Sequence, residues 1–234
     1  MTAALAWGAL AASSLVIGAL LGLVREWPDR LIGIVLAFGA GALISAVSFD
    51  LAQEGARVGD PGFLGLGLAV GAITYFVLNR MVGRRSRASG SGGGTSLALG
   101  AFLDGIPEQA VLGIGIAIGE GVSVGLLVAI FVSNLPEAIG SSSEMRAAGR
   151  QPQAIRRLWL LVALICTTAT VAGYAIADNV SGNLNAVIDG FAAGALLVML
   201  IDSMIPDAVR KGGDVAGLVT VLGFAVAASL SGLS

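Results

Sequence analysis

The chain has 234 residues, of which 56% are hydrophobic and only 12% charged, and its mean hydropathy is +0.91. A soluble domain carries about 25% charged residues, and the apolar residues here run in long blocks, so the composition excludes an ordinary soluble globular protein. The net charge of −2 does not point to a nucleic-acid partner, and the absence of histidine removes the commonest transition-metal ligand.

Eight apolar blocks follow one another along the chain, each close to the length of about 20 residues that crosses a bilayer. The sequence therefore predicts an all-α integral membrane protein, a single polytopic domain of residues 1–234 with eight transmembrane helices. The first block has no basic residue before it, which favours a first span over a cleaved signal peptide. The segment 83–95, rich in Gly, Ser and Arg, predicts a flexible cytoplasmic loop. The predicted spans cover residues 3–24, 31–53, 62–82, 95–119, 121–143, 158–177, 184–206 and 213–233.

Basic residues sort to one side of this eight-span arrangement. Of the 13 Lys and Arg residues, all but Arg57 fall on one face of the membrane. Because cytoplasmic loops carry an excess of Lys and Arg, that face is predicted to be cytoplasmic. We therefore expect a multi-pass protein of the plasma (inner) membrane with both termini outside the cytoplasm. The glycine-rich spans could also support a homodimer.

Two pairs of spans resemble one another. Residues 38–43 (FGAGAL) in the second span match 191–196 (FAAGAL) in the seventh, and residues 105–108 (GIPE) in the fourth match 134–137 (NLPE) in the fifth. An odd number of crossings separates the members of each pair, so they run in opposite directions. We predict inverted repeats in which spans 1–3 match spans 6–8 and span 4 matches span 5. Such repeats, with a site at their interface, are a transporter architecture.

Acidic and polar side chains gather near the middle of the fourth and fifth spans. Asp104 and Glu108 lie four residues apart and share one helix face, and Ser133 and Glu137 have the same spacing. Asn134 precedes Glu137 by three residues. An ionised carboxylate at this depth is costly unless compensated, and neither span contains Lys, Arg or His. We therefore predict that these five side chains hold a divalent metal ion, the alternatives being protonated acids or a hydrated cavity.

Two prolines strengthen the prediction of a polar pathway. Pro107 removes the hydrogen bond to the carbonyl of Leu103, and Pro136 does the same for Val132. Irregular backbone at this depth is tolerated only where it lines protein or water. The resulting ligand set is all oxygen, which by ligand type alone favours Mg²⁺, Mn²⁺ or Ca²⁺ over Zn²⁺.

Other residues carry weaker predictions. Asp50, toward the outer end of the second span, and Asp202, toward the inner end of the seventh, either line a pathway for the ion or lie at the headgroup level. Cys166, the single cysteine, is expected to be a small buried hydrophobic residue. Two further functions stay open. One is a proton-coupled carrier of an organic cation, and the other is an intramembrane aspartyl protease that pairs Asp104 with Asp202.

The motifs of spans four and five resemble those of the ZIP family of metal transporters, in its bacterial branch. Members pair a His-Asn-x-Pro-Glu-Gly motif with x-Asn-x-Pro-Glu-Gly, and this chain has DGIPEQ at 104–109 and SNLPEA at 133–138. The Phe-x-Ala-Gly-x-Leu segments, the eight spans and the outer termini also fit. The resemblance implies a transporter of zinc, iron or manganese that is not an enzyme and has no tightly bound cofactor. It also implies that spans 1, 4, 5 and 6 move against spans 2, 3, 7 and 8.

Carried over position by position, the resemblance implies a histidine-free site that holds one metal ion rather than two. Gly105 cannot supply the asparagine ligand usual at its position, and the sixth span contains no acid where members often donate one. The implied ligands are Glu108, Glu137 and Asn134, with Asp104 in place of the usual histidine and Ser133 in place of a stronger ligand.

Overall fold

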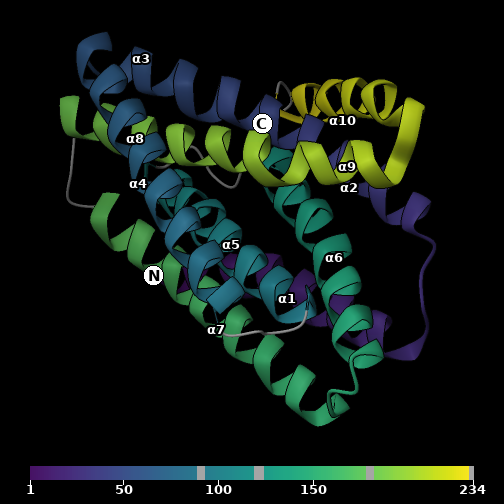
Figure 1. The fold of residues 1–234 in the computed structure, drawn as a ribbon. Helices are drawn as coiled ribbons and strands as arrows, with labels where there is room; N and C mark the ends of the chain where they lie inside the picture. Colours follow the sequence, from purple (N-terminus) through teal and green to yellow (C-terminus); the bar gives the residue numbers. More distant parts are fainter. Residues whose placement is uncertain (89–92, 119–123, 178–181, 232–234) are drawn as a thin grey trace.

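Helices make up all the regular structure in the described part of the computed structural model, which confirms the all-α prediction (Figure 1). The backbone is described for residues 1–88, 93–118, 124–177 and 182–231, and the side chains for 1–81, 105–117, 124–177 and 182–230. The α-helices are α1 (Thr2–Val24), α2 (Asp29–Ala46), α3 (Glu54–Val58), α4 (Pro61–Ala88), α5 (Gly93–Ile118), α6 (Val124–Ala147), α7 (Pro152–Ala177), α8 (Asn183–Met199), α9 (Ile205–Gly212) and α10 (Ala216–Ser231).

Two long helices each contain a π-helical segment. Helix α2 continues through η1 (Val47–Gln53) into α3, and α8 continues through η2 (Leu200–Met204) into α9. Asp50 lies in η1 and Asp202 lies in η2. π-helical turns occur frequently at functional sites. Asp50 and Asp202, predicted either to line a pathway or to lie at the headgroup level, are therefore both placed where a helix departs from regular α geometry.

Six helical stretches among the described residues are long and apolar enough to cross a membrane. Helix α5, whose side chains before Gly105 are not described, is not among them, and the last stretch is 48 residues long. The outer surface is apolar as well, since Leu164 and Leu218 are 61% and 76% exposed. The chain is thus a multi-pass membrane protein. The six stretches are Thr2–Val24, Asp29–Val58, Pro61–Met81, Val124–Ala147, Pro152–Ala177 and Asn183–Leu230.

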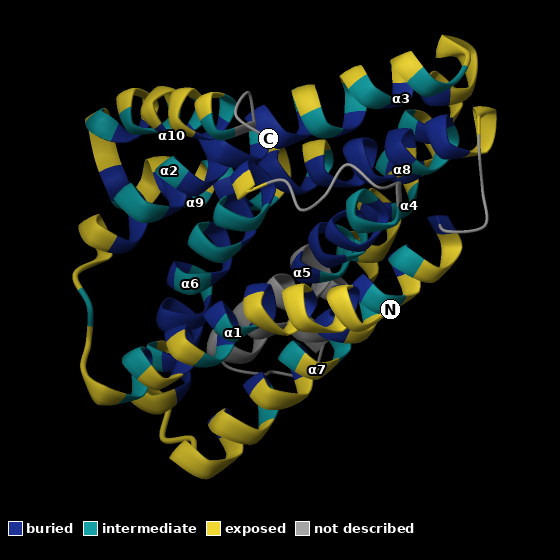
Figure 2. Ribbon diagram, turned by 180° about the vertical axis from the view of Figure 1, so that it is seen from behind, coloured by how far each residue is buried: buried dark blue, intermediate teal, exposed yellow. Residues whose placement is uncertain are grey.

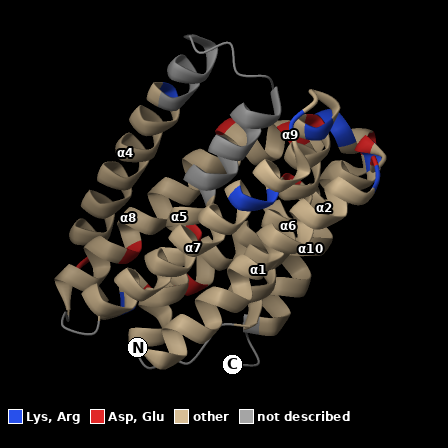
Figure 3. Cartoon of the chain, turned by 90° about the horizontal axis from the view of Figure 1, so that it is seen from below, with Lys and Arg blue, Asp and Glu red and all other residues tan. Residues whose placement is uncertain are grey.

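The helices differ in how far they are buried and in where they carry charged residues. Helices α2, α6 and α8 are the more enclosed, whereas α4 and α7 expose most of their residues (Figure 2). Large apolar side chains such as Leu43, Leu196 and Met199 are fully buried at the centre. Most of the helix length carries no charge, and Lys and Arg gather near α9 and at helix ends (Figure 3). Among the described side chains, the buried charged residues are Glu108 and Asp189.

Close helix contacts depend on glycine. Helix α4 packs mainly on α8, α10 on α2, α1 on α6 and α5 on α7. A Cβ on Gly71 of α4 would lie 1.9 Å from the carbonyl oxygen of Phe191, and a Cβ on Gly223 of α10 would lie 2.0 Å from that of Phe38. Only a residue without a side chain allows the two backbones to approach so closely. These contacts fix α4 and α10 against the two long π-containing helices.

The segment 83–95, predicted as a loop, is largely helical in the described part. Helix α4 runs on to Ala88, and α5 begins at Gly93. Arg and Ala are good helix formers, so the first half of this segment continues the preceding helix. Residues 89–92, between the two helices, lie outside the described residues.

Candidate metal centre

Three of the five predicted ligands meet between α5 and α6. Asn134 Nδ2 donates a hydrogen bond of 2.9 Å to Oε2 of Glu108, and Ser133 Oγ donates one of 3.3 Å to Oε1. All three residues are 1% exposed. The two oxygens of a buried carboxylate are therefore each contacted by a neutral donor from the neighbouring helix. The motif spacing that pointed to these residues brings them together in three dimensions.

The two donors hold Glu108 differently. The hydroxyl of Ser133 also lies 3.0 Å from the carbonyl oxygen of Ile130, so one proton has two acceptors within reach. Asn134 has the shorter contact with Glu108. Its Oδ1 lies on the side of Gly105, 4.0 Å from the position that a Cβ on that glycine would take. Asn134 thus contacts the carboxylate with its amide nitrogen and has its amide oxygen on the side of Gly105 in α5.

The remaining predicted residues are more dispersed. Glu137 lies one turn beyond Ser133 on α6 and is partly exposed, Asp50 is half-buried, and Asp202 is exposed. The side chain of Asp104 lies outside the described residues. Among the side chains that are described, no group of three or more His, Cys, Asp or Glu is placed to hold a metal ion. The structure therefore brings together Glu108, Ser133 and Asn134, and does not test the complete five-residue set.

Cys166 lies beside this group, which sequence reasoning missed. The residue is fully buried, as predicted, but its position is more informative than its burial. A Cβ on Gly105 would lie 2.9 Å from Cys166 Sγ. The glycine at this position therefore leaves room for a thiol from α7 next to Asn134. No spacing pattern connects residues 105 and 166, because the contact arises from the packing of two helices distant in sequence.

A second buried polar pair continues toward α7. Thr170 Oγ1 donates a hydrogen bond of 2.6 Å to Gln109 Oε1, and both residues are fully buried. Among the described residues, none accepts a hydrogen bond from the buried Nε2 of Gln109. Gln109 follows Glu108 directly in the chain, and Thr170 follows Cys166 by one helical turn. A polar strip thus extends from α6 across α5 to α7 inside an otherwise apolar bundle.

A basic side chain also reaches this region from another helix. Lys211 Nζ of α9 lies 3.6 Å from the position that a Cβ on Gly140 would take. Gly140 is one turn beyond Glu137 on α6. The fourth and fifth predicted spans contain no basic residue. The ammonium group of Lys211 comes from a helix about 70 residues further along the chain.

Comparison with known proteins gives one informative likeness. No protein-family model matches the chain. A protein of Arabidopsis thaliana described as "Putative zinc transporter" is 30% identical over 200 residues, which cover 81% of this chain and 32% of that protein. The chain therefore spans about a third of the length of the curated relative it matches.

Proposed function

We propose that this chain is a ZIP-family protein, not an enzyme, that moves a divalent metal ion across a membrane through a site built on Glu108. The observation that carries the proposal is a carboxylate 1% exposed inside a multi-pass membrane protein, contacted by side chains of a second helix. Ionisable residues inside a membrane are expensive and typically mark ion pathways. The likeness to an Arabidopsis protein described as a zinc transporter supports the same class of cargo.

The proposed ligands combine hard and soft atoms. Glu108 and Asn134 supply oxygen, as would Asp104, Ser133 and Glu137 if transport brings them to the same ion. Oxygen ligands suit Mn²⁺ and Fe²⁺, whereas a thiolate from Cys166 would favour Zn²⁺. We therefore keep zinc, iron and manganese as the class of cargo. Asp50 and Asp202, each in a π-helical segment, are proposed to line the approaches to the site.

We further propose eight crossings with inverted repeats, with α5 and a second half of the 48-residue stretch added to the others. Gly213, with a φ of 69°, would mark the reversal between α9 and α10. The π-helical segments support the repeat, since η1 begins nine residues after Phe38 and η2 begins nine residues after Phe191. The glycine contacts support it as well, since Gly71 packs on Phe191 and Gly223 packs on Phe38. In the plasma membrane, both termini would then lie on the side away from the cytoplasm.

Transport is tested by reconstituting the full chain in liposomes and following the entry of Zn²⁺, Mn²⁺ and Fe²⁺ with a trapped fluorescent indicator. We expect flux of at least one of these ions, and loss of that flux in Glu108→Ala and in Glu137→Ala. Glu144→Ala, at an exposed position of the same helix α6, is the matched control and should transport normally. A complete absence of metal-dependent flux, or flux that survives both substitutions, would contradict the proposal.

The single cysteine provides a direct reporter of metal occupancy. Because Cys166 Sγ lies next to Gly105 and Asn134, a metal ion at the proposed site should shield the thiol. We expect a small methanethiosulfonate reagent to modify Cys166 more slowly when the transported ion is present than when it is absent. Mass spectrometry of the intact chain measures the rate. In Glu108→Gln the metal should no longer protect Cys166, and protection that persisted there would show that Glu108 is not needed to hold the ion.

A further inference from the structure

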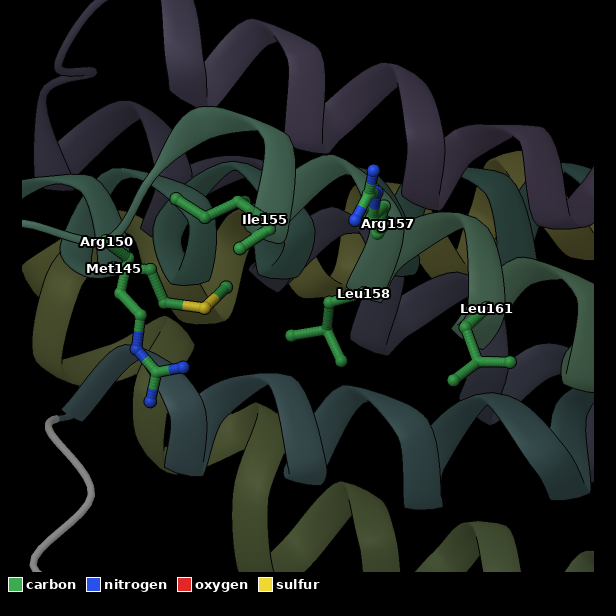
Figure 4. Close-up of a pocket in the computed structure, with 7 residues that line it drawn as sticks. Met145, Arg150, Ile155, Arg157, Leu158 and Leu161 are labelled. Atoms are coloured by element: carbon green, nitrogen blue, oxygen red, sulfur yellow. The ribbon is translucent and has the colours of Figure 1, made fainter.

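A groove of about 450 Å³ lies between the α6–α7 connection and the first half of α7, away from the proposed metal centre (Figure 4). Its volume falls in the range of about 300–1,000 Å³ that is typical of small-molecule sites. Its lining includes four large apolar residues, Met145, Ile155, Leu158 and Leu161, and two basic ones, Arg150 and Arg157.

The apolar wall of the groove continues onto the outer surface of the bundle. Met145 and Ile155 are almost fully buried and form its inner side, whereas Leu161 is 53% exposed. Leu158 and Leu161 project into the same space below α7 in Figure 4. Leu164, three residues further along α7, is also exposed. An apolar molecule in the groove would therefore be continuous with the hydrocarbon that covers α7, which favours a lipid tail over a soluble ligand.

The two arginines give the groove its charge. Arg150 lies in the α6–α7 connection and Arg157 lies on α7, with Met145 and Ile155 between them in Figure 4. Both arginines are exposed. In the proposed topology this connection lies on the cytoplasmic side, at the level of anionic headgroups. Basic pockets between transmembrane helices on that side are suited to phospholipid headgroups.

We infer that this groove binds an anionic phospholipid, with its headgroup at the edge of the groove that carries the two lining arginines, Arg150 and Arg157, and one acyl chain along Leu158 and Leu161. The lipid would link the end of α6 to the beginning of α7. The placement of the headgroup rests on the proposed membrane topology. The binding itself does not depend on metal transport, so its test is independent of the metal site.

Native mass spectrometry of the detergent-solubilised full chain, titrated with dioleoyl phosphatidylglycerol, tests the inference. We expect at least one tightly bound lipid and weaker binding of dioleoyl phosphatidylcholine. Arg157→Gln should weaken phosphatidylglycerol binding about fivefold, the effect of one basic residue near a membrane surface. Arg156→Gln is the matched control, since it removes the same charge from the neighbouring position on another face of α7 and does not line the groove.

Two further measurements distinguish lipid binding in the groove from non-specific electrostatic attraction between lipid and protein. Leu161→Trp should reduce lipid binding with no change of charge, because the larger ring fills the apolar part of the groove. Millimolar inorganic phosphate should not displace the lipid, because phosphate alone lacks the tail. The inference would be overturned if Arg156→Gln and Arg157→Gln weakened binding equally, if Leu161→Trp bound lipid normally, or if free phosphate competed fully.

Discussion

Glu108→Gln is expected to reduce metal flux by about 100-fold or more while leaving the metal-free protein at least as stable as the parent. Glutamine keeps the shape of the side chain but removes the charge that a divalent ion needs, and ligand losses in metal sites exceed the about 10–100-fold cost of removing a supporting residue. The carboxylate is buried, and its contacts with Ser133 and Asn134 come from neutral groups. The amide oxygen of glutamine can still accept the hydrogen bond from Asn134, so the substitution should not lower the unfolding temperature.

This combination of results distinguishes a functional carboxylate from a structural one. Flux is measured in liposomes, and stability is measured by thermal unfolding in detergent. Glu144→Gln makes the same chemical change at an exposed position of α6 and should alter neither quantity. If Glu108→Gln unfolded the protein, the role of Glu108 would be structural. If it transported metal at the parental rate, the site would lie elsewhere.

Gly71→Ala is expected to lower the unfolding temperature by about 5–10 °C. The new Cβ would lie 1.9 Å from the backbone oxygen of Phe191, so α4 and α8 would have to separate. Overpacking of this kind typically costs about 1–3 kcal/mol and occasionally more, and each kcal/mol lowers the unfolding temperature by about 2–4 °C in a chain of this size.

Gly65→Ala in the same helix is the matched control. Apart from the adjoining residues and backbone of its own helix, no atom of the described residues lies within 4 Å of the position that its Cβ would take, so the substitution should be neutral or slightly stabilising. The same contrast should appear in α10, where Gly223 packs on Phe38 and Gly217 has open space around its Cβ position. Equal unfolding temperatures for Gly71→Ala and Gly65→Ala would show that α4 does not pack on α8 as described.

Most of the helical architecture follows from the length of the apolar blocks. A block of about 20 apolar residues can satisfy its backbone in a membrane only as a helix, so the prediction of an all-α membrane protein needed no tertiary information. The π-helical segments at Val47 and Leu200 were not predicted, because they add one residue to a turn without changing hydrophobicity. The helical start of the 83–95 segment was not predicted, because a high content of Gly and Ser is typical of loops.

Part of the candidate site could also be predicted from the sequence, and part could not. Glu108, Ser133 and Asn134 could be identified because two motifs with a Pro-Glu pair place polar groups at mid-span, where they are costly. Cys166 and Lys211 reach this region from helices far along the chain, and only the packing of those helices places them there. Composition and spacing could not associate the thiol of Cys166 with the candidate site, nor the ammonium group of Lys211 with Gly140 on α6.

The location of the metal ion is the most direct test of the proposed function. Crystals of the full chain soaked in Zn²⁺ or Mn²⁺ and measured at the absorption edge of the metal would show the ion by anomalous scattering. We expect a peak within coordinating distance, about 2.0–2.2 Å, of a carboxylate oxygen of Glu108, with Asn134 beside it. A peak bound only by surface carboxylates, with none next to Glu108, would contradict the proposed transport site.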